Sequence, residues 1–490
     1  MNARRWFLPS ISLSLWLVFF LGLSLSNWRQ VLISADGDPC LHRRIGEWML
    51  EHRQVITHEE FSHTRLGAPL ISKEWLGEVL FALATRALDW NGLVFVAAVL
   101  IATTLWWLHR QLLGEGVDLL LATGGVLLVA LTGSMHWLAR PHLWTHLLAV
   151  GLAWQLRQYV AGRYSTRQLW FTVPALMLVW ANLHGAFFTG FILLGVYFVG
   201  ALCERRFDRA RILAGIGIAS LAASLVNPNG WQLHRQILGF LRTPALSGMV
   251  NEFRSPNFHS GGTDGLVLLL LVLALTLLIV RARWSPTEIL LVGGWGYCAL
   301  HSVRNVPIFA FVTAPVLAKH VQAFLAGLSA GRRIDLYRRV NARVSALQGN
   351  AGGQALFVVA VAGVLLTASQ RPTEILPDRF PVAAVAKLAS GAIPVNGEVF
   401  NDYGWGGYLL WALPERKVFI DGRNDFYGKE LVDDFNSVDD VQPGWEGVLE
   451  KHRVGWTMLS VKHPLNTVLG LHPGWKKVYV DDVAVIYARR

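Results

Sequence analysis

The stretch SADGDPCLHRRIGEWML, residues 34–50, follows the first apolar run of the chain, residues 11–33, without a polar linker. That run is long enough to cross a bilayer. The stretch after it brings two aspartates, Asp36 and Asp38, to the end of the run and continues as a basic segment with helical spacing of its apolar residues. A membrane-spanning segment that leads into a charged, amphipathic one predicts an integral membrane protein with chemistry at the membrane boundary.

Further apolar runs of roughly spanning length recur along the chain. They lie near residues 92–109, 117–134, 142–156, 169–184, 186–203, 212–226, 264–280, 287–301, 304–319 and 354–369. Only 16% of the residues are charged, against about 25% in soluble domains. We therefore predict a polytopic α-helical membrane protein with about eleven transmembrane helices, which form a domain over residues 1–370.

The net charge of +11 suggests a nucleic-acid partner until the basic residues are placed along the chain. Arginines concentrate in every second loop between the apolar runs, as at Arg205, Arg206, Arg209 and Arg211, while the alternate loops hold few. This pattern is the positive-inside bias of membrane proteins. It predicts a cytoplasmic N-terminus, an extracytoplasmic C-terminus in the plasma (inner) membrane, and no nucleic-acid partner.

The first outer loop, residues 34–90, is predicted to hold two short helices on the membrane surface, over 41–53 and 74–90. Leu41, Ile45, Trp48 and Met49 recur at helical spacing in the first, and Trp75, Val79, Leu80, Leu83 and Ala87 in the second. The second segment is an alternative transmembrane crossing. Counting it as one would invert every later loop and remove the charge bias, so we favour a surface helix.

From about Arg371 the composition becomes that of a soluble domain. Residues 417–422, 454–461 and 478–488 are rich in β-branched and aromatic residues, which predicts strands, the last as a hairpin turning at Asp481 and Asp482. We predict a small extracytoplasmic α/β domain over 371–490.

The two aspartates of the opening stretch are the leading candidates for chemistry. Carboxylates at this spacing can share Mg²⁺ or Mn²⁺ with a substrate phosphate. An alternative holds for Asp38, because an aspartate followed by Pro39 and an amphipathic run is a typical helix N-cap. Asp36 has no such explanation.

Polar residues at the predicted outer ends of the helices are costly unless they are paired or used. His142 and His146 lie one helical turn apart, a spacing that can bind metal, but they more plausibly line a cavity mouth with Arg140. His184 precedes Gly185, where the alternative is close helix packing.

The longest outer loop of the membrane domain, residues 227–265, contains Glu252 and Arg254, which form either a solvated pair or a second carboxylate with an anion contact. Arg304 begins a later apolar run. It is either a phosphate clamp, since arginine binds phosphate in a bidentate manner, or an arginine that snorkels to the interface.

The whole arrangement resembles the GT-C superfamily of integral-membrane glycosyltransferases, and distantly the catalytic subunits of oligosaccharyltransferases. In that family a Trp-Trp-Asp-Tyr-Gly motif precedes a strand and an Asp-Gly pair. This chain has NDYGWGGYLLWALPERKVFIDG over residues 401–422, which keeps Asp402, Tyr403 and Gly404, with Phe400 and Asn401 where the family has two tryptophans.

The resemblance implies a glycosyltransferase that moves a sugar from a polyprenyl-phosphate-linked donor to an acceptor protein or glycan on the outer face of the membrane. It implies that Asp36 is the reacting acid, assisted by Asp38 and Glu252, with Mg²⁺ or Mn²⁺ on the two aspartates. Substrate contacts would then come from His42, Arg140, His142, His184, Arg254, Arg304, Asp402 and Tyr403. The alternatives are a transporter (flippase) of lipid-linked glycans, which would need polar residues across the membrane midplane, and a non-catalytic scaffold for envelope assembly.

Overall fold

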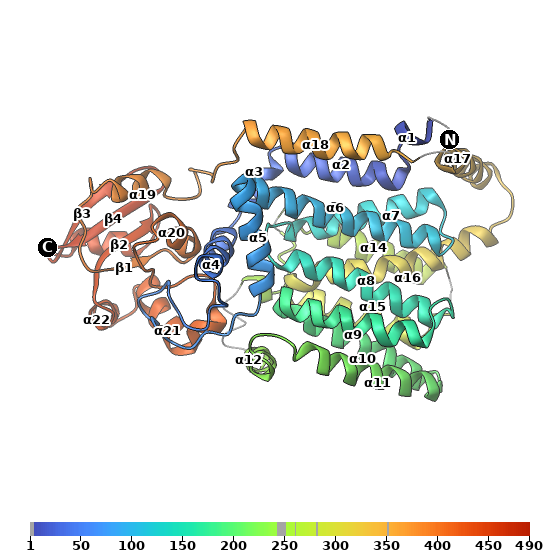
Figure 1. Ribbon diagram of the computed structural model, residues 1–490, viewed down its shortest axis with the longest axis horizontal. Coiled ribbons are helices and arrows are strands. Elements are labelled where there is room, and N and C mark those ends of the chain that lie inside the picture. Colours follow the sequence, from blue (N-terminus) through green and yellow to red (C-terminus); the bar gives the residue numbers. More distant parts are fainter. Residues whose placement is uncertain (1–3, 243–250, 260, 281–282, 350–351) are drawn as a thin grey trace.

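The computed structural model describes residues 4–242, 251–259, 261–280, 283–349 and 352–490. Figure 1 shows an elongated molecule, in which a bundle of roughly parallel helices carries a small α/β domain at one end. Part of the predicted outer loop 227–265, namely residues 243–250 and 260, lies outside the described residues.

Every predicted apolar run falls on a helix of the bundle. The first is a bent pair, α2 (Ile11–Leu25) and α3 (Trp28–Ser34), with an angle of 69° between its halves. The others are α6 (Trp90–Gly114), α7 (Leu119–Gly133), α8 (His142–Val160), α9 (Thr166–Leu183), α10 (Phe188–Cys203), α11 (Phe207–Ser224), α14 (Asp264–Ile279), α15 (Pro286–His301), α16 (Val306–Gly327) and α18 (Gln354–Gln370).

Four helical stretches among the described residues are long and apolar enough to cross a membrane, or five if the bent pair counts as one span. They are Trp90–Gly114, Leu119–His136, Gly185–Cys203 and Val303–Gly327, three of which include a short 3₁₀ turn: η1 (Ser134–His136), η2 (Gly185–Phe187) and η4 (Val303–Asn305). A helix suits this environment because all its backbone hydrogen bonds are internal. The prediction of a polytopic membrane protein is thus confirmed, while the eleven crossings and their orientation stay predictions.

Short elements complete the two ends of the bundle. These are α1 (Arg4–Phe7), α12 (Trp231–Leu241), η3 (Asn251–Phe253) and α17 (Arg332–Gly349). In Figure 1 α12 lies at the end that carries the α/β domain, and α17 lies at the opposite end with the N-terminus.

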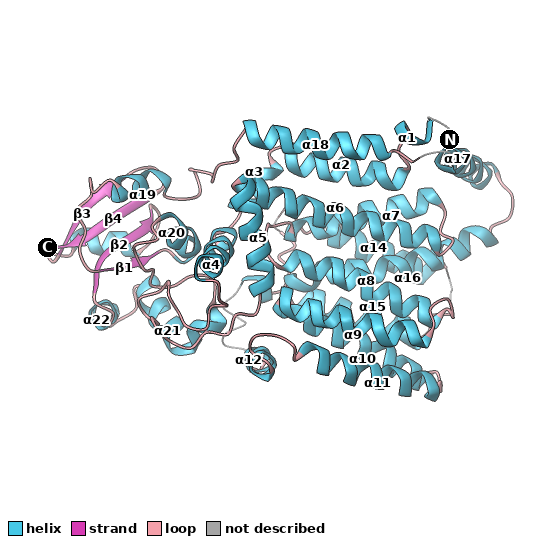
Figure 2. Ribbon diagram, viewed as in Figure 1, coloured by secondary structure: helices cyan, strands magenta, loops and turns pink. Residues whose placement is uncertain are grey.

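Both predicted helices of the first outer loop are present, as α4 (Asp38–His52) and α5 (Trp75–Leu88). In α4 the predicted stripe of Leu41, Ile45 and Met49 is buried, because α4 lies between the bundle and the α/β domain. α5 runs across the ends of the bundle helices in Figures 1 and 2 and does not join them.

The two loop helices pack closely on each other, and this decides which face of α5 is buried. A Cβ at Gly46 of α4 would lie only 2.1 Å from the backbone oxygen of Glu78 on α5. The buried face of α5 consists of Gly77, Glu78, Phe81, Ala82 and Thr85. Of the predicted apolar stripe, Trp75 and Val79 are half-buried and pack against the core, while Leu83 is exposed. The stripe indicated the helix correctly but only part of the face that packs on protein.

The C-terminal domain is built on a four-stranded sheet with the order β1-β2-β4-β3. Its elements are α19 (Val382–Ala389), β1 (Glu398–Asn401), η5 (Tyr403–Trp405), α20 (Gly406–Ala412), α21 (Asn424–Asp439), α22 (Trp445–Lys451), β2 (Val454–Ser460), α23 (Leu465–Leu471), β3 (Trp475–Val480) and β4 (Ala484–Arg489). β1 pairs parallel with β2, and the other two pairs are antiparallel.

The predicted hairpin is confirmed, with the Asp481 carboxylate accepting hydrogen bonds from the backbone N–H groups of Val483 and Ala484. The predicted strand at 417–422 is wrong. That segment is buried and extended, but its backbone pairs with the outer loop through Val418 and with the side chain of Asn401, which bonds both Phe419 and Ile420. The first strand of the sheet, β1, was not predicted.

The outer loop between α4 and α5 is part of the same folded unit as the C-terminal domain. His63 donates its backbone N–H to the carbonyl of Val418 (3.0 Å), and Val418 donates to the carbonyl of Phe61 (3.0 Å). Beside this seam the fully buried Glu59 forms an ion pair with Arg423. The predicted boundary at 370/371 stays a prediction, and this loop crosses it in space.

Candidate active site

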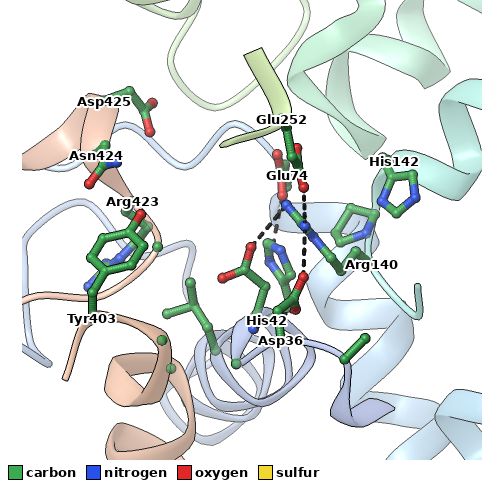
Figure 3. Close-up of a pocket in the computed structure, with 18 of the residues that line it drawn as sticks. Asp36, His42, Glu74, Arg140, His142, Glu252, Tyr403, Arg423, Asn424 and Asp425 are labelled. Carbon is green, nitrogen blue, oxygen red and sulfur yellow. Dashed lines mark hydrogen bonds and ion pairs between the residues drawn. The ribbon is translucent and has the colours of Figure 1, made fainter. Parts of the chain in front are cut away.

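A cavity of about 500 Å³ lies between the end of the bundle and the C-terminal domain. Figure 3 shows its two walls, with Arg140, Glu252 and His142 on one side and Tyr403, Asn424 and Asp425 on the other. The first wall comes from loops at the helix ends. The second comes from the turns that precede α20 and α21.

The turn of residues 36–38 is part of the first wall and lines the cavity. Gly37 has helical dihedral angles, so α4 begins at Asp38 and the Asp38 side chain makes no capping hydrogen bond. It is Asp36 that accepts the backbone N–H of Asp38, at 3.1 Å. The interpretation of Asp38 as a side-chain cap is therefore wrong, while Pro39 does occupy the first turn as predicted.

Arg140 stands at the centre of this wall. Its loop is held against the end of α3 by a hydrogen bond from the Ala139 N–H to the Leu32 carbonyl (2.8 Å). From there the guanidinium reaches Asp36 (3.1 Å), Asp38 (2.9 Å) and Glu252 (2.5 Å). Three carboxylates from two distant loops thus meet on one largely buried cation.

The electrostatics of this group separate its acids. Burial raises the pKa of Asp36 to about 6, against the opposing effect of Arg140. Burial acts in the same direction on Glu252, but Arg140 and Arg304 overcome it and hold the pKa of that carboxyl well below its usual range. Near neutral pH Glu252 is a fixed negative charge, whereas Asp36 exchanges a proton within the physiological range. A carboxyl poised in this way is suited to general base work.

These carboxylates do not fit a divalent cation as they stand. A hard cation needs several carboxylate oxygens directed at one open point, and one oxygen of each of Asp36, Asp38 and Glu252 is directed at Arg140. The metal prediction for Asp36 and Asp38 stays a prediction.

A different group among the described residues has the spacing of metal ligands. His42 on α4 lies with Glu74 and Glu78 of α5, and their ligating atoms are all within 4.8 Å of one another. His42 Nδ1 is 3.0 Å from Glu78 and 3.5 Å from Glu74, and both acids raise the pKa of the His42 imidazole against the effect of burial. The other carboxylate oxygen of Glu74 is 3.4 Å from His184. These three buried residues can bind a divalent cation, or the two glutamates can stabilise a protonated His42.

Among the other cations that line the cavity, Lys73 and Arg304 differ in how they are paired. Lys73 bridges the two walls by an ion pair with Asp425 (2.6 Å). Arg304 makes no ion pair with the described residues, and its guanidinium lies 5.2 Å from the Phe253 ring centre. Arg304 therefore has hydrogen-bonding capacity left for an anionic ligand.

The second wall meets the turn of residues 36–38 backbone to backbone. A Cβ at Gly407 would lie 2.3 Å from the Gly37 carbonyl oxygen, and a Cβ at Gly422 would lie 2.3 Å from a carboxylate oxygen of Asp38. The glycines of the 401–422 motif are thus needed where the motif contacts the acidic turn. Beside them Tyr403 lines the cavity, and the buried Asn424 has a side-chain oxygen without a hydrogen-bond partner among the described residues.

The cavity brings together most of the predicted site residues. Its lining includes Asp36, Asp38, His42, Arg140, His142, His184, Glu252, Arg304 and Tyr403. Arg254 is exposed and does not line it, although its neighbours Glu252 and Phe253 do. Asp402 also stays outside, since its carboxylate caps η5 through the N–H of Gly404 (3.0 Å). His142 Nε2 donates to the His136 carbonyl (2.8 Å), and the described part of the chain offers no third ligand that would make a metal site with His146.

Other lining residues were not singled out from the sequence. They are Lys73, Glu74, Arg423, Asn424 and Asp425, with Phe240 and Phe253. One signal was available for part of this set, because Glu74 and Glu78 lie one turn apart at the start of a mostly apolar helix, where buried acids need partners. The residues of α21 gave no such signal.

Solved structures show what this architecture is similar to. The archaeal oligosaccharyltransferase AglB from Archaeoglobus fulgidus, in complex with an inhibitory peptide and a dolichol-phosphate, aligns over 98% of this chain and 74% of that chain, with a TM-score of 0.58 and 14% identity. ArnT from Cupriavidus metallidurans, bound to undecaprenyl phosphate, aligns over 98% of this chain and 96% of that chain, with a TM-score of 0.52 and 12% identity.

A second structure of the Archaeoglobus fulgidus enzyme, a complex with Zn and sulfate, aligns with a TM-score of 0.50 and 14% identity over 98% of this chain and 73% of that chain. No protein-family model matches the chain, and no curated protein matches its sequence. The likeness therefore lies in the fold and extends over nearly the whole chain. The chain has the fold of the GT-C membrane glycosyltransferases, which AglB and ArnT share.

Proposed function

We propose that this protein is a glycosyltransferase that moves a sugar or glycan from a polyprenyl-phosphate-linked donor to an acceptor on the outer face of the plasma membrane. The observation that carries the proposal is the cavity beside Asp36, in which acids and cations from distant loops meet at one end of a GT-C fold. The similar structures of AglB and ArnT hold dolichol-phosphate and undecaprenyl phosphate, which supports a donor of this chemical class.

Asp36 is the general base in this proposal. Its carboxylate takes the proton of an acceptor hydroxyl as the acceptor oxygen bonds to the anomeric carbon of the sugar. The bond from that carbon to the phosphate oxygen breaks in the same step, and the polyprenyl phosphate leaves with the electron pair. A pKa of about 6 suits this role, because Asp36 is ionised near neutral pH and is still basic enough to accept a proton.

Arg304 stabilises the leaving phosphate. The phosphate gains negative charge in the transition state, and a cation fixed beside it lowers the barrier. Arg304 is the better candidate of the two arginines on this wall, because the guanidinium of Arg140 is already bound to three carboxylates.

The C-terminal wall receives the acceptor, a protein or a glycan. Tyr403 and Asn424 offer a hydroxyl and an amide oxygen across the cavity from Asp36, and the Asn424 oxygen has capacity to accept a hydrogen bond. These groups suit an acceptor rich in hydroxyl or amide groups.

The substitution Asp36→Asn tests the proposal. It keeps the size of the side chain and removes the base, so we expect transfer from a polyprenyl-phosphate sugar to fall by about 100-fold or more. Asp208→Asn is the matched control, since Asp208 is almost fully exposed at the start of α11 and far from the cavity. The measurement is sugar transfer by purified protein in proteoliposomes, with size-exclusion profiles to show that both variants are folded.

Full activity of Asp36→Asn would remove Asp36 from the reaction. Donor binding by the wild-type protein without any release of sugar would favour the flippase. Normal envelope assembly with an inactive Asp36→Asn variant would favour the scaffold.

A further inference from the structure

Arg140 occupies a position that is unusual for an arginine. Its Nη1 contacts both Asp36 (3.1 Å) and Glu252 (2.5 Å), and its Nη2 contacts Asp38 (2.9 Å). Figure 3 shows the guanidinium between carboxylates that enter from different sides. Because the three acids carry like charges, the guanidinium is what holds them together.

The charges explain why a cation is needed there. Three carboxylates in a partly buried wall repel one another and favour either protonation or a bound cation. The Arg140 side chain is only 15% exposed, and each of the three acid side chains is exposed by about a third or less. Oxygen ligands from three carboxylates are also what a hard divalent cation binds. The same three carboxylates can thus surround either a divalent cation or a guanidinium, and in this structure they surround the guanidinium of Arg140.

The orientation of Asp36 depends on this centre. One of its carboxylate oxygens accepts the backbone N–H of Asp38, and the other contacts Arg140. Without Arg140 the second oxygen would lose its only ion pair among the described residues. The direction in which Asp36 presents itself to the cavity is therefore set by Arg140 together with the turn of residues 36–38.

We propose that Arg140 takes the place of a divalent cation among Asp36, Asp38 and Glu252, and that it acts as a positioning residue for Asp36. The positioning part rests on the proposed function. The replacement part does not, because it concerns which cation the three carboxylates bind. It is an alternative to the expectation, drawn from the spacing of the two aspartates and from the family resemblance, that Asp36 and Asp38 ligate Mg²⁺ or Mn²⁺.

Removing the guanidinium tests the replacement directly. Arg140→Ala leaves three carboxylates facing an open space, and we expect the variant to bind one Mn²⁺ ion more than the wild-type protein. The measurement is Mn²⁺ titration of chelator-treated, detergent-solubilised protein by electron paramagnetic resonance. Any Mn²⁺ at His42, Glu74 and Glu78 is common to both proteins and cancels in the comparison.

A Tm measurement and two further variants test the same expectation. Mn²⁺ should raise the Tm of Arg140→Ala by more than it raises the Tm of the wild-type protein, because a ligand stabilises the state that binds it. The double variant Asp36→Asn with Arg140→Ala should lose the additional ion. Where the alanine variant does not fold, Arg140→Gln serves with the same expectation, since a neutral amide also leaves the acids without a cation.

Transfer activity tests the positioning role. We expect kcat of Arg140→Ala to fall at least tenfold with little change in the KM of the donor, and Mn²⁺ to restore part of kcat. Equal numbers of bound Mn²⁺ ions in the wild type and in Arg140→Ala would overturn the proposal. So would a loss of Mn²⁺ from the otherwise wild-type protein on Asp36→Asn, because Asp36 would then already be a ligand. An additional ion in a protein that transfers no sugar would support the replacement and count against the proposed function.

Discussion

The two walls of the cavity are built on different principles. The wall from the bundle presents charge: Asp36, Arg140 and Glu252 lie on loops at the helix ends and form one ionic group. The wall from the C-terminal domain presents backbone and shape, with glycines in contact with the acidic turn and Tyr403 and Asn424 facing the cavity. In the proposed function, the wall from the bundle carries out the reaction, and the wall from the C-terminal domain closes the site and contacts the acceptor.

This division depends on how the C-terminal domain is attached. The attachment has a buried ionic centre, in which Arg423 binds Glu59 of the outer loop through two hydrogen bonds (2.8 and 2.9 Å) and Asp421 of its own turn (2.6 Å). Glu59 and Asp421 are fully buried. This arginine is not part of the ionic group around Arg140, and together with the Lys73–Asp425 ion pair it holds the two walls in place.

The largest effect is expected from breaking that attachment. Arg423→Met leaves two buried carboxylates without their cation, which costs about 3–5 kcal/mol in proteins. Lys429→Met is the matched control, since the Lys429–Asp433 pair lies on α21, which begins directly after Arg423, and is exposed. Its loss should therefore cost less than about 1 kcal/mol. The measurement is thermal unfolding of the detergent-solubilised variants. Equal shifts of Tm in the two variants would show that the ionic centre does not hold the walls together.

The contact between the walls can also be broken without changing any charge. A Cβ at Gly407 would lie 2.3 Å from the Gly37 carbonyl oxygen, and backbone cannot move aside as a side chain does. We expect Gly407→Ala to destabilise the protein by about 1–3 kcal/mol, the usual range for overpacking, and to lower transfer because Asp36 and Asp38 flank Gly37.

The control for that variant is Gly447→Ala. Gly447 lies in α22 of the same domain, and no neighbouring atom lies within 4 Å of the place that an added methyl group would take, so this change should be neutral or slightly stabilising. Unfolding and transfer assays on both variants check the prediction. A Gly407→Ala protein with wild-type transfer would mean that the glycine motif does not position the acidic turn.

The same contrast explains what could be predicted from the sequence. The bundle and the acidic turn were readable because lipid forces long apolar runs and leaves the few charges between them conspicuous. Asp36, Arg140, Glu252 and Arg304 were found in this way. In the C-terminal wall Tyr403 was named, but Asn424 and Asp425 were not singled out, because they look like ordinary surface residues of a helix until the fold places them opposite Asp36.

The errors have physical causes of the same kind. Asp38 resembles a cap in sequence, but Gly37 already has helical dihedral angles and so shifts the helix start by one residue. Residues 417–422 resemble a strand, but the outer loop and Asn401 satisfy their backbone groups in place of a sheet ladder. Each depends on contacts between segments far apart in the chain, which local patterns do not contain.

The smallest effect is expected from a change of pH, which tests whether Asp36 of the charged wall acts as a base. Since burial raises the pKa of Asp36 to about 6, the base is ionised above that pH and protonated below it. We expect kcat to be nearly constant from pH 7 to 8 and to fall about tenfold per unit well below pH 6, a change of about 1.4 kcal/mol per unit in the barrier. Glu252 adds no inflection in this range, because Arg140 and Arg304 keep its pKa well below the usual value.

Unfolding measured over the same pH range distinguishes a titrating base from a protein that loses its fold. If kcat is flat from pH 5 to 8 while the protein stays folded, proton transfer to Asp36 is not part of the slow step, and the charged wall binds the donor without taking the proton of the acceptor.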